Sequence, residues 1–173
     1  MGDCLTVTFY LCGPILHDEN RDRSLSWREI AYDILSGHGY GVFNPMVSEK
    51  YGNVHYDDHF KELIVPRDKL MIDRSDVVIV NYIPKDLSIG TCMEVMYAHM
   101  TGKKVIWFAE DEELCIKLEE NPWVIAHNDW EFVRPFSAEG IKDLCEWFNC
   151  FGLHEPIALV NGYPKGYENR DFC

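Results

Sequence analysis

Short apolar runs alternate with longer amphipathic stretches over most of the chain. The runs are rich in β-branched and aromatic residues, which favours strands. Two of them are nearly unbroken, as expected of strands buried on both faces of a parallel sheet. The predicted strands are residues 5–11, 40–43, 76–81 and 104–109, with an edge strand at 130–133.

The amphipathic stretches carry apolar residues at a spacing of three or four, which predicts helices. The predicted helices are residues 24–36, 60–72, 88–101, 111–121 and 137–150. Pro66 either kinks the second helix or starts a new piece within it. In the third helix, Met93, Met96 and Met100 form a stripe that we interpret as core.

Strands that alternate with helices predict an α/β fold in a single domain. We expect a flavodoxin-like or Rossmann-like parallel sheet of about five strands with helices on both faces. Residues 1–150 are expected to form this domain, and 151–173 a C-terminal tail that wraps it or is mobile. Ligands of such sheets bind beyond the carboxyl ends of the strands. The loops after Leu11, Phe43 and Asn81 are therefore predicted to form the site.

A formal charge of −13 and seven scattered cysteines narrow the classes of function. An acidic chain is poorly suited to bind nucleic acid polymers or anionic membranes, so neither partner is expected. The cysteines lack zinc-type spacing and indicate reduced thiols of a cytoplasmic protein, with Cys12 as a small hydrophobe. No apolar run is long enough to span a bilayer. We expect neither a metal nor a cofactor.

Residues 88–94 (SIGTCME) follow a predicted buried strand and open a helix. Ser88 suits a helix N-cap, Gly90 lets a ligand approach the backbone, and the free N–H groups form an anion site. Glu94 lies in the first turns, where the positive helix end favours its ionised form. An ionised carboxylate at a ligand cleft is what covalent sugar chemistry requires. The alternative is that Glu94 only interacts with the helix dipole.

Three short motifs occur in a set order, each at a strand end: YLCGPI at 10–15, RD at 67–68 ahead of SDVVIVN at 75–81, and GTCME at 90–94. Together, over residues 5–110, they resemble the nucleoside 2-deoxyribosyltransferase family and its relatives, the nucleoside 5'-monophosphate N-glycosidases. The resemblance implies that Glu94 attacks C1' of the sugar and forms a covalent glycosyl-enzyme. It also implies that Tyr10 holds the glutamate and that Asp68 assists proton transfer to the departing base.

The residue six positions before the glutamate separates the two branches of this family. The transferases generally carry an aspartate there, whereas the N-glycosidases carry a serine that binds the 5'-phosphate, and this chain has Ser88. A carboxylate would repel a phosphate, whereas a hydroxyl and a helix N-terminus donate to one. A phosphorylated substrate is therefore expected.

Several further residues are candidates for binding this substrate. Arg21 and Arg23 are expected at the phosphate, or else form an exposed charge cluster with neighbouring acids. A neighbouring subunit would supply a further contact from Lys117, Asn121 or Asn128, because the resemblance implies a homodimer or larger homo-oligomer. The full set of expected contacts is Ser88, Gly90, Gly13, Pro14, Ile15, Arg21, Arg23, Asn44 and Asn121.

The function expected from the sequence is an N-glycosidase that cleaves a (2'-deoxy)nucleoside 5'-monophosphate to free base and sugar 5-phosphate. Deoxyribose is favoured, because relatives with a tyrosine at the position of Tyr10 tend to take it. One alternative is a transferase that exchanges bases between nucleosides. Another is a phosphoribohydrolase of the cytokinin-activating type, although the glycine pair that precedes Gly90 in that motif is missing. A third is a non-catalytic nucleotide-sensing domain.

Overall fold

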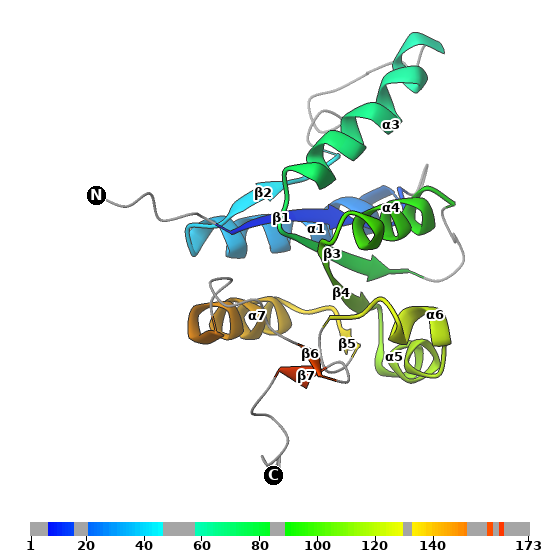
Figure 1. Cartoon of the computed structure of the whole chain (residues 1–173). Coiled ribbons are helices and arrows are strands. Elements are labelled where there is room, and N and C mark those ends of the chain that lie inside the picture. Colours follow the sequence, from blue (N-terminus) through cyan, green and yellow to red (C-terminus); the bar gives the residue numbers. More distant parts are fainter. Residues whose placement is uncertain are drawn as a thin grey trace.

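The computed structural model describes residues 7–15, 21–46, 58–83, 89–129, 133–151, 159–160 and 163–164. Its centre is a five-stranded parallel sheet in the order β2-β1-β3-β4-β5 (Figure 1). This is the strand order of flavodoxin-like sheets, so the predicted α/β class is confirmed. The strands are β1 (Thr8–Cys12), β2 (Gly41–Phe43), β3 (Val77–Tyr82), β4 (Lys104–Ala109) and β5 (Arg134–Pro135).

The helices form two layers, one on each face of the sheet (Figure 1). One layer holds α1 (Arg21–Gly37) and α7 (Ala138–Phe151); the other holds α3 (Asp58–Asp73), α4 (Ile89–Met100), α5 (Glu112–Glu119) and the short α6 (Pro122–Ile125). The helix α3 continues through Pro66 as one element. Among the residues described, no helix is long and apolar enough to cross a membrane.

The residues of the central strands enter the two cores alternately, because successive side chains of a strand point to opposite faces. On β1, Phe9 and Leu11 pack towards α1 and α7, whereas Tyr10 and Cys12 pack towards the layer that contains α4. This alternation directs two polar groups of β1, a phenol and a thiol, towards the helix that carries Glu94.

The methionine stripe of α4 is exposed, which corrects its interpretation as core. Met93, Met96 and Met100 are 65%, 36% and 78% exposed, and Ile89 continues the stripe at 79%. The side of the helix that packs on the sheet carries the buried residues Thr91, Val95 and Ala98 instead. Periodicity shows which residues share a helix face, but α4 has two apolar faces, and only one of them can meet the sheet.

Two further elements differ from expectation. The edge strand expected at 130–133 lies at Arg134–Pro135, because its position is set by pairing with the last residues of β4; residues 130–132 lie outside the described part of the chain. A short antiparallel pair, β6 (Leu159–Val160) and β7 (Tyr163–Pro164), lies in the C-terminal tail, where no strand was expected.

Candidate active site

The carboxyl ends of β1 and β3 lie side by side at the centre of the sheet, where Cys12 is paired with Val80. The strand order reverses at this point, since β1 continues to β2 on one side and β3 to β4 on the other. Sheets of this order bind ligands in the crevice beyond such a switch point. Residues 13–15 leave β1 here, and the chain from β3 leads to the start of α4.

Glu94 projects from the second turn of α4 towards the end of β1. The Cys12 thiol donates a hydrogen bond to its Oε2 atom, with a sulfur–oxygen distance of 3.0 Å. The same thiol lies 3.8 Å from the carbonyl oxygen of Thr91. The sequence does not predict this contact, because a cysteine in an apolar run is typical of a small hydrophobic core residue. The strand alternation that places Cys12 on the same face as Tyr10 is the signal that could have found it.

The two other predicted catalytic residues lie beside Glu94. Tyr10 is fully buried, its hydroxyl has no well-formed hydrogen bond, and Glu94 and Asp68 are both near enough to influence its ionisation. Asp68 is buried on α3, and its Oδ1 accepts from Arg67 Nε at 2.9 Å and lies 2.8 Å from Arg67 Nη2. The structure therefore brings together groups from β1, α3 and α4.

Burial raises the pKa of Glu94 above its ordinary value, in the direction opposite to the effect predicted for the helix end. The loss of water around the carboxylate is the largest influence; Asp68 adds to it, whereas Cys12, Tyr10 and the positive charge of Arg28 oppose it. Burial also raises the pKa of Cys12 and of Tyr10 well above their ordinary values. The Glu94 carboxyl group thus faces two donors, Cys12 and Tyr10, whose raised pKa values keep them protonated at neutral pH.

Arg28 of α1 is fully buried beneath the loop that follows β1. Its guanidinium donates to the carbonyl oxygens of Gly13 at 2.7 Å, Ser24 at 2.8 Å, and Leu11 and Pro14 at 3.4 Å each. Arg28 is not among the residues predicted from the sequence. The available signal was an arginine within the apolar face of an otherwise amphipathic helix, where a charge must find hydrogen-bond partners.

The loop of residues 13–15 is shaped by packing. A Cβ atom at Gly13 would lie 3.0 Å from the Asn81 carbonyl oxygen and 3.0 Å from the Trp27 ring, so a larger residue would force these elements apart. Pro14 is buried and Ile15 is partly exposed. The predicted contacts of these three residues with a ligand stay predictions.

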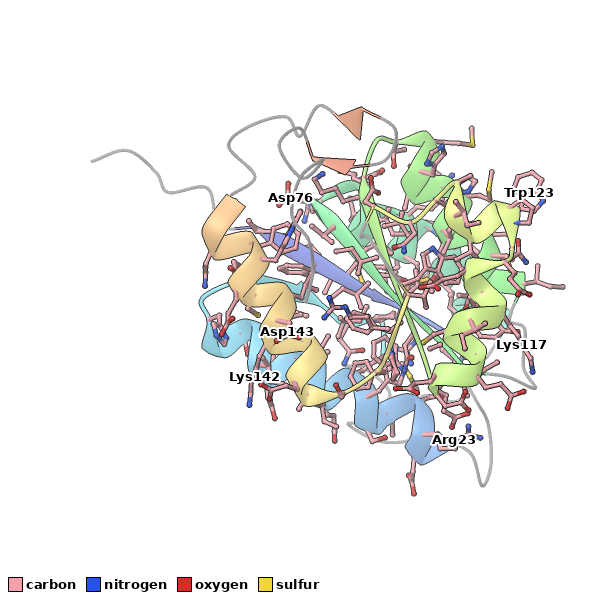
Figure 2. All side chains as sticks on the ribbon, turned by 90° about the horizontal axis from the view of Figure 1, so that it is seen from below. Arg23, Asp76, Lys117, Trp123, Lys142 and Asp143 are labelled. Carbon is pink, nitrogen blue, oxygen red and sulfur yellow. The ribbon has the colours of Figure 1, made fainter. Side chains whose placement is uncertain are left out.

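Three other predicted contacts already have partners within the chain. Arg23, at the first turn of α1 (Figure 2), forms an ion pair with Glu110. Asn44 accepts a hydrogen bond from the backbone N–H two residues further on, at 3.0 Å. Asn121 caps α6 with its side-chain oxygen. A substrate would have to compete with these bonds, so the proposed contacts stay predictions.

Of the three remaining candidates, only Gly90 is fully described by the structure. Gly90 lies exposed in the first turn of α4. Ser88 and the side chain of Arg21 lie outside the described residues. Their predicted contacts with a phosphate are therefore untested.

A model of the nucleoside 2-deoxyribosyltransferase family matches residues 9–135, a range that contains Tyr10, Asp68 and Glu94. A search of curated protein sequences finds no match. Among solved structures, a 2-deoxyribosyltransferase from the psychrotolerant bacterium Bacillus psychrosaccharolyticus aligns with a TM-score of 0.62 and 17% identity, over 79% of this chain and 91% of that one. A CMP N-glycosidase from Clostridium botulinum aligns with a TM-score of 0.52 and 16% identity, over 81% and 98%. At these identities the two structures share the fold with this chain.

Proposed function

The chain belongs to the nucleoside 2-deoxyribosyltransferase family and is an enzyme of that family; from this premise we propose that it cleaves the base–sugar bond of a (2'-deoxy)nucleoside 5'-monophosphate, with Glu94 as the nucleophile. The observation that supports this most directly is the position of Glu94. Its largely buried carboxylate lies at the switch point of the sheet and faces Tyr10, Cys12 and Asp68.

The proposed reaction has two steps on one carboxylate. Glu94 attacks C1' of the sugar while the C1'–N bond breaks and its electron pair leaves with the base, through an oxocarbenium-like transition state. Asp68, or a water molecule next to it, supplies the proton that the departing base needs. Water then attacks C1' and displaces Glu94, which gives free base and deoxyribose 5-phosphate. Burial makes the carboxylate more basic, which strengthens it as a nucleophile once it is ionised.

The 5'-phosphate is proposed to dock on Ser88, on the backbone of Gly90 and on the loop after β1. Ser88 stands where a transferase would carry an aspartate, and the twelve-residue helix α4 starts directly after it. Free N–H groups at a helix N-terminus favour an anion. One of the aligned structures is itself an enzyme for a nucleoside monophosphate, a CMP N-glycosidase.

Base release from a panel of substrates tests this proposal. The purified protein is incubated with deoxyribonucleoside and ribonucleoside 5'-monophosphates and with the matching nucleosides, each with a second free base added, and chromatography follows the bases. We expect release from the deoxyribonucleoside monophosphates and none from the nucleosides. Turnover of nucleosides with the monophosphates inert would contradict the phosphate assignment.

Base exchange between nucleosides is the second candidate function, and the family match favours it because the family takes its description from the transferases. It uses the same glycosyl–Glu94 intermediate, with a second base in place of water. In the panel above it would appear as a new nucleoside formed from the added base.

We also propose that the chain forms a homodimer or larger homo-oligomer through the exposed face of α4. Ile89, Met93, Met96 and Met100 follow one another at spacings of four, three and four residues, which is the period of a helix–helix seam. Contiguous exposed apolar side chains mark interaction sites, and a homodimer pairs the same patch on both subunits. The same helix carries Glu94, so the interface would lie next to the site.

A further inference from the structure

We infer that Cys12 is a positioning residue for Glu94: its thiol anchors Oε2 and thereby leaves Oε1 as the oxygen that meets the sugar carbon. The inference rests on the proposed role of Glu94 as nucleophile. It assigns a function to a side chain that composition and hydrophobic pattern describe only as core.

The thiol is held rigidly from the sheet side. Cys12 is the last residue of β1, is fully buried, and is paired through its backbone with Val80 of the neighbouring strand. Its sulfur lies 3.0 Å from Glu94 Oε2 but 3.8 Å from the Thr91 carbonyl oxygen. The carboxylate is the nearer acceptor, and a charged acceptor makes the stronger hydrogen bond.

Three other groups influence the charge of Glu94, and a fourth is bound to one of them. Tyr10 faces the carboxylate from β1, Asp68 from α3, and Arg28 acts from α1, while Arg67 is bound to Asp68. Tyr10 also acts on the carboxylate as a donor, but its hydroxyl does not reach well-formed geometry, whereas the Cys12 thiol lies 3.0 Å from Glu94 Oε2. We therefore assign to Cys12 the contact that fixes the position of Oε2.

The choice of a thiol has a chemical consequence. An S–H group is a weaker donor than a hydroxyl, so it can fix the direction of a carboxylate while lowering its pKa less than a hydroxyl would. A serine hydroxyl at the same place would bind the ionised form more strongly and lower the pKa of Glu94. An alanine would remove the donor, which would raise that pKa and release the carboxylate to rotate.

The test uses Cys12→Ser and Cys12→Ala, with Cys145→Ala as the matched control. Cys145 is also a fully buried thiol, but it lies in the core on the other face of the sheet. The first readout is the titration of the Glu94 side chain by carbon NMR, with the signal identified by its loss in Glu94→Gln. This readout needs no turnover, so it remains informative even if the proposed glycosidase activity is absent.

We expect opposite shifts in the Glu94 titration: to higher pH in Cys12→Ala, to lower pH in Cys12→Ser, and none in Cys145→Ala. The acid limb of kcat/KM should move in the same directions, and on that limb Cys12→Ala should lose roughly fivefold in kcat/KM, the value of a modest hydrogen bond. If folded Cys12→Ser and Cys12→Ala both titrate like the wild type, the inference is wrong. If the titrations shift but the wild type releases no base from any substrate, the proposed function fails while the contact stands.

Discussion

The Arg28 guanidinium lies 2.7 Å from the carbonyl oxygen of Gly13, so a buried charge on α1 holds the loop that follows β1. The same guanidinium contacts the Met46 sulfur at 3.3 Å, in the segment that follows β2. One side chain thus joins two of the three loops at which the sequence predicts the ligand. The shape of these two loops therefore depends on Arg28, although Arg28 is not one of the predicted contacts.

Arg28→Lys should therefore damage the site and the fold together. A lysine keeps the charge but has no planar fork with which to reach several carbonyl oxygens at once. We expect a loss of about 2–4 kcal/mol in the free energy of unfolding, as when a buried charge loses its partners, and a fall in kcat/KM of more than about tenfold. Chemical denaturation and base release measure these effects. Arg134→Lys, at a half-exposed ion pair, is the control and should change stability by less than about 1 kcal/mol.

Glu94→Gln should make the protein more stable at neutral and alkaline pH. The folded-state pKa of Glu94 is raised, so the ionised carboxylate costs stability, and this cost appears as the pH rises from its ordinary value of 4.5 through the raised value. The glutamine removes the cost. We expect a gain of the order of 1 kcal/mol, or about 2–4 °C in Tm for a chain of this size. The gain should vanish below pH 4.5, where the glutamate is protonated in both states.

Thermal unfolding across this pH range checks that prediction, with Glu113→Gln at an exposed position as the control. A gain of the same size at every pH would show that the carboxylate charge is not its cause.

Asp68→Asn should slow the release of the base. If Asp68 or its water supplies the proton, loss of the carboxyl should cost about 10²- to 10⁴-fold in kcat. The loss should be smaller for a substrate whose base leaves readily without a proton, because such a base needs less assistance. Single-turnover rates on a good and a poor leaving group distinguish the cases. An equal loss on both would indicate that Asp68 binds the substrate without assisting proton transfer.

Met93→Lys should separate the subunits of the proposed assembly. It places a charge in the exposed apolar stripe of α4, where a second copy would have to bury it. We expect at least roughly a tenfold increase in the dissociation constant by analytical ultracentrifugation, since burial of an unpaired charge costs more than 1.4 kcal/mol. Ile30→Lys, on the opposite face of the sheet, is the control. A wild-type protein that stays monomeric at tens of micromolar would contradict the proposed interface.

The sequence predicts the architecture well because the signals for it are local. Alternating apolar runs and amphipathic stretches give the strands, the helices and the parallel class, and Tyr10 and Glu94 lie where strand and helix ends predict them. The order of the strands depends on pairing between distant segments, and β5 was misplaced for this reason.

The contacts that the sequence did not predict depend on distance across the fold. Cys12 and Glu94 are 82 residues apart, so no local pattern connects them. The main partners of Arg28 are backbone carbonyl oxygens, which every residue has, so the residue types do not identify them. The sequence predicts the methionine stripe of α4 as core because hydrophobicity alone does not distinguish the face that meets the sheet from an exposed apolar face.

The most direct test of the account compares base release by the wild type and by Glu94→Gln, on the best deoxyribonucleoside monophosphate of the panel. The variant keeps the size of the side chain and removes the nucleophilic carboxylate. We predict that the wild type releases free base and that the variant, folded and at least as stable at neutral pH, loses about 10³-fold or more in kcat. Near-wild-type turnover by Glu94→Gln would contradict the assignment of Glu94 as the nucleophile.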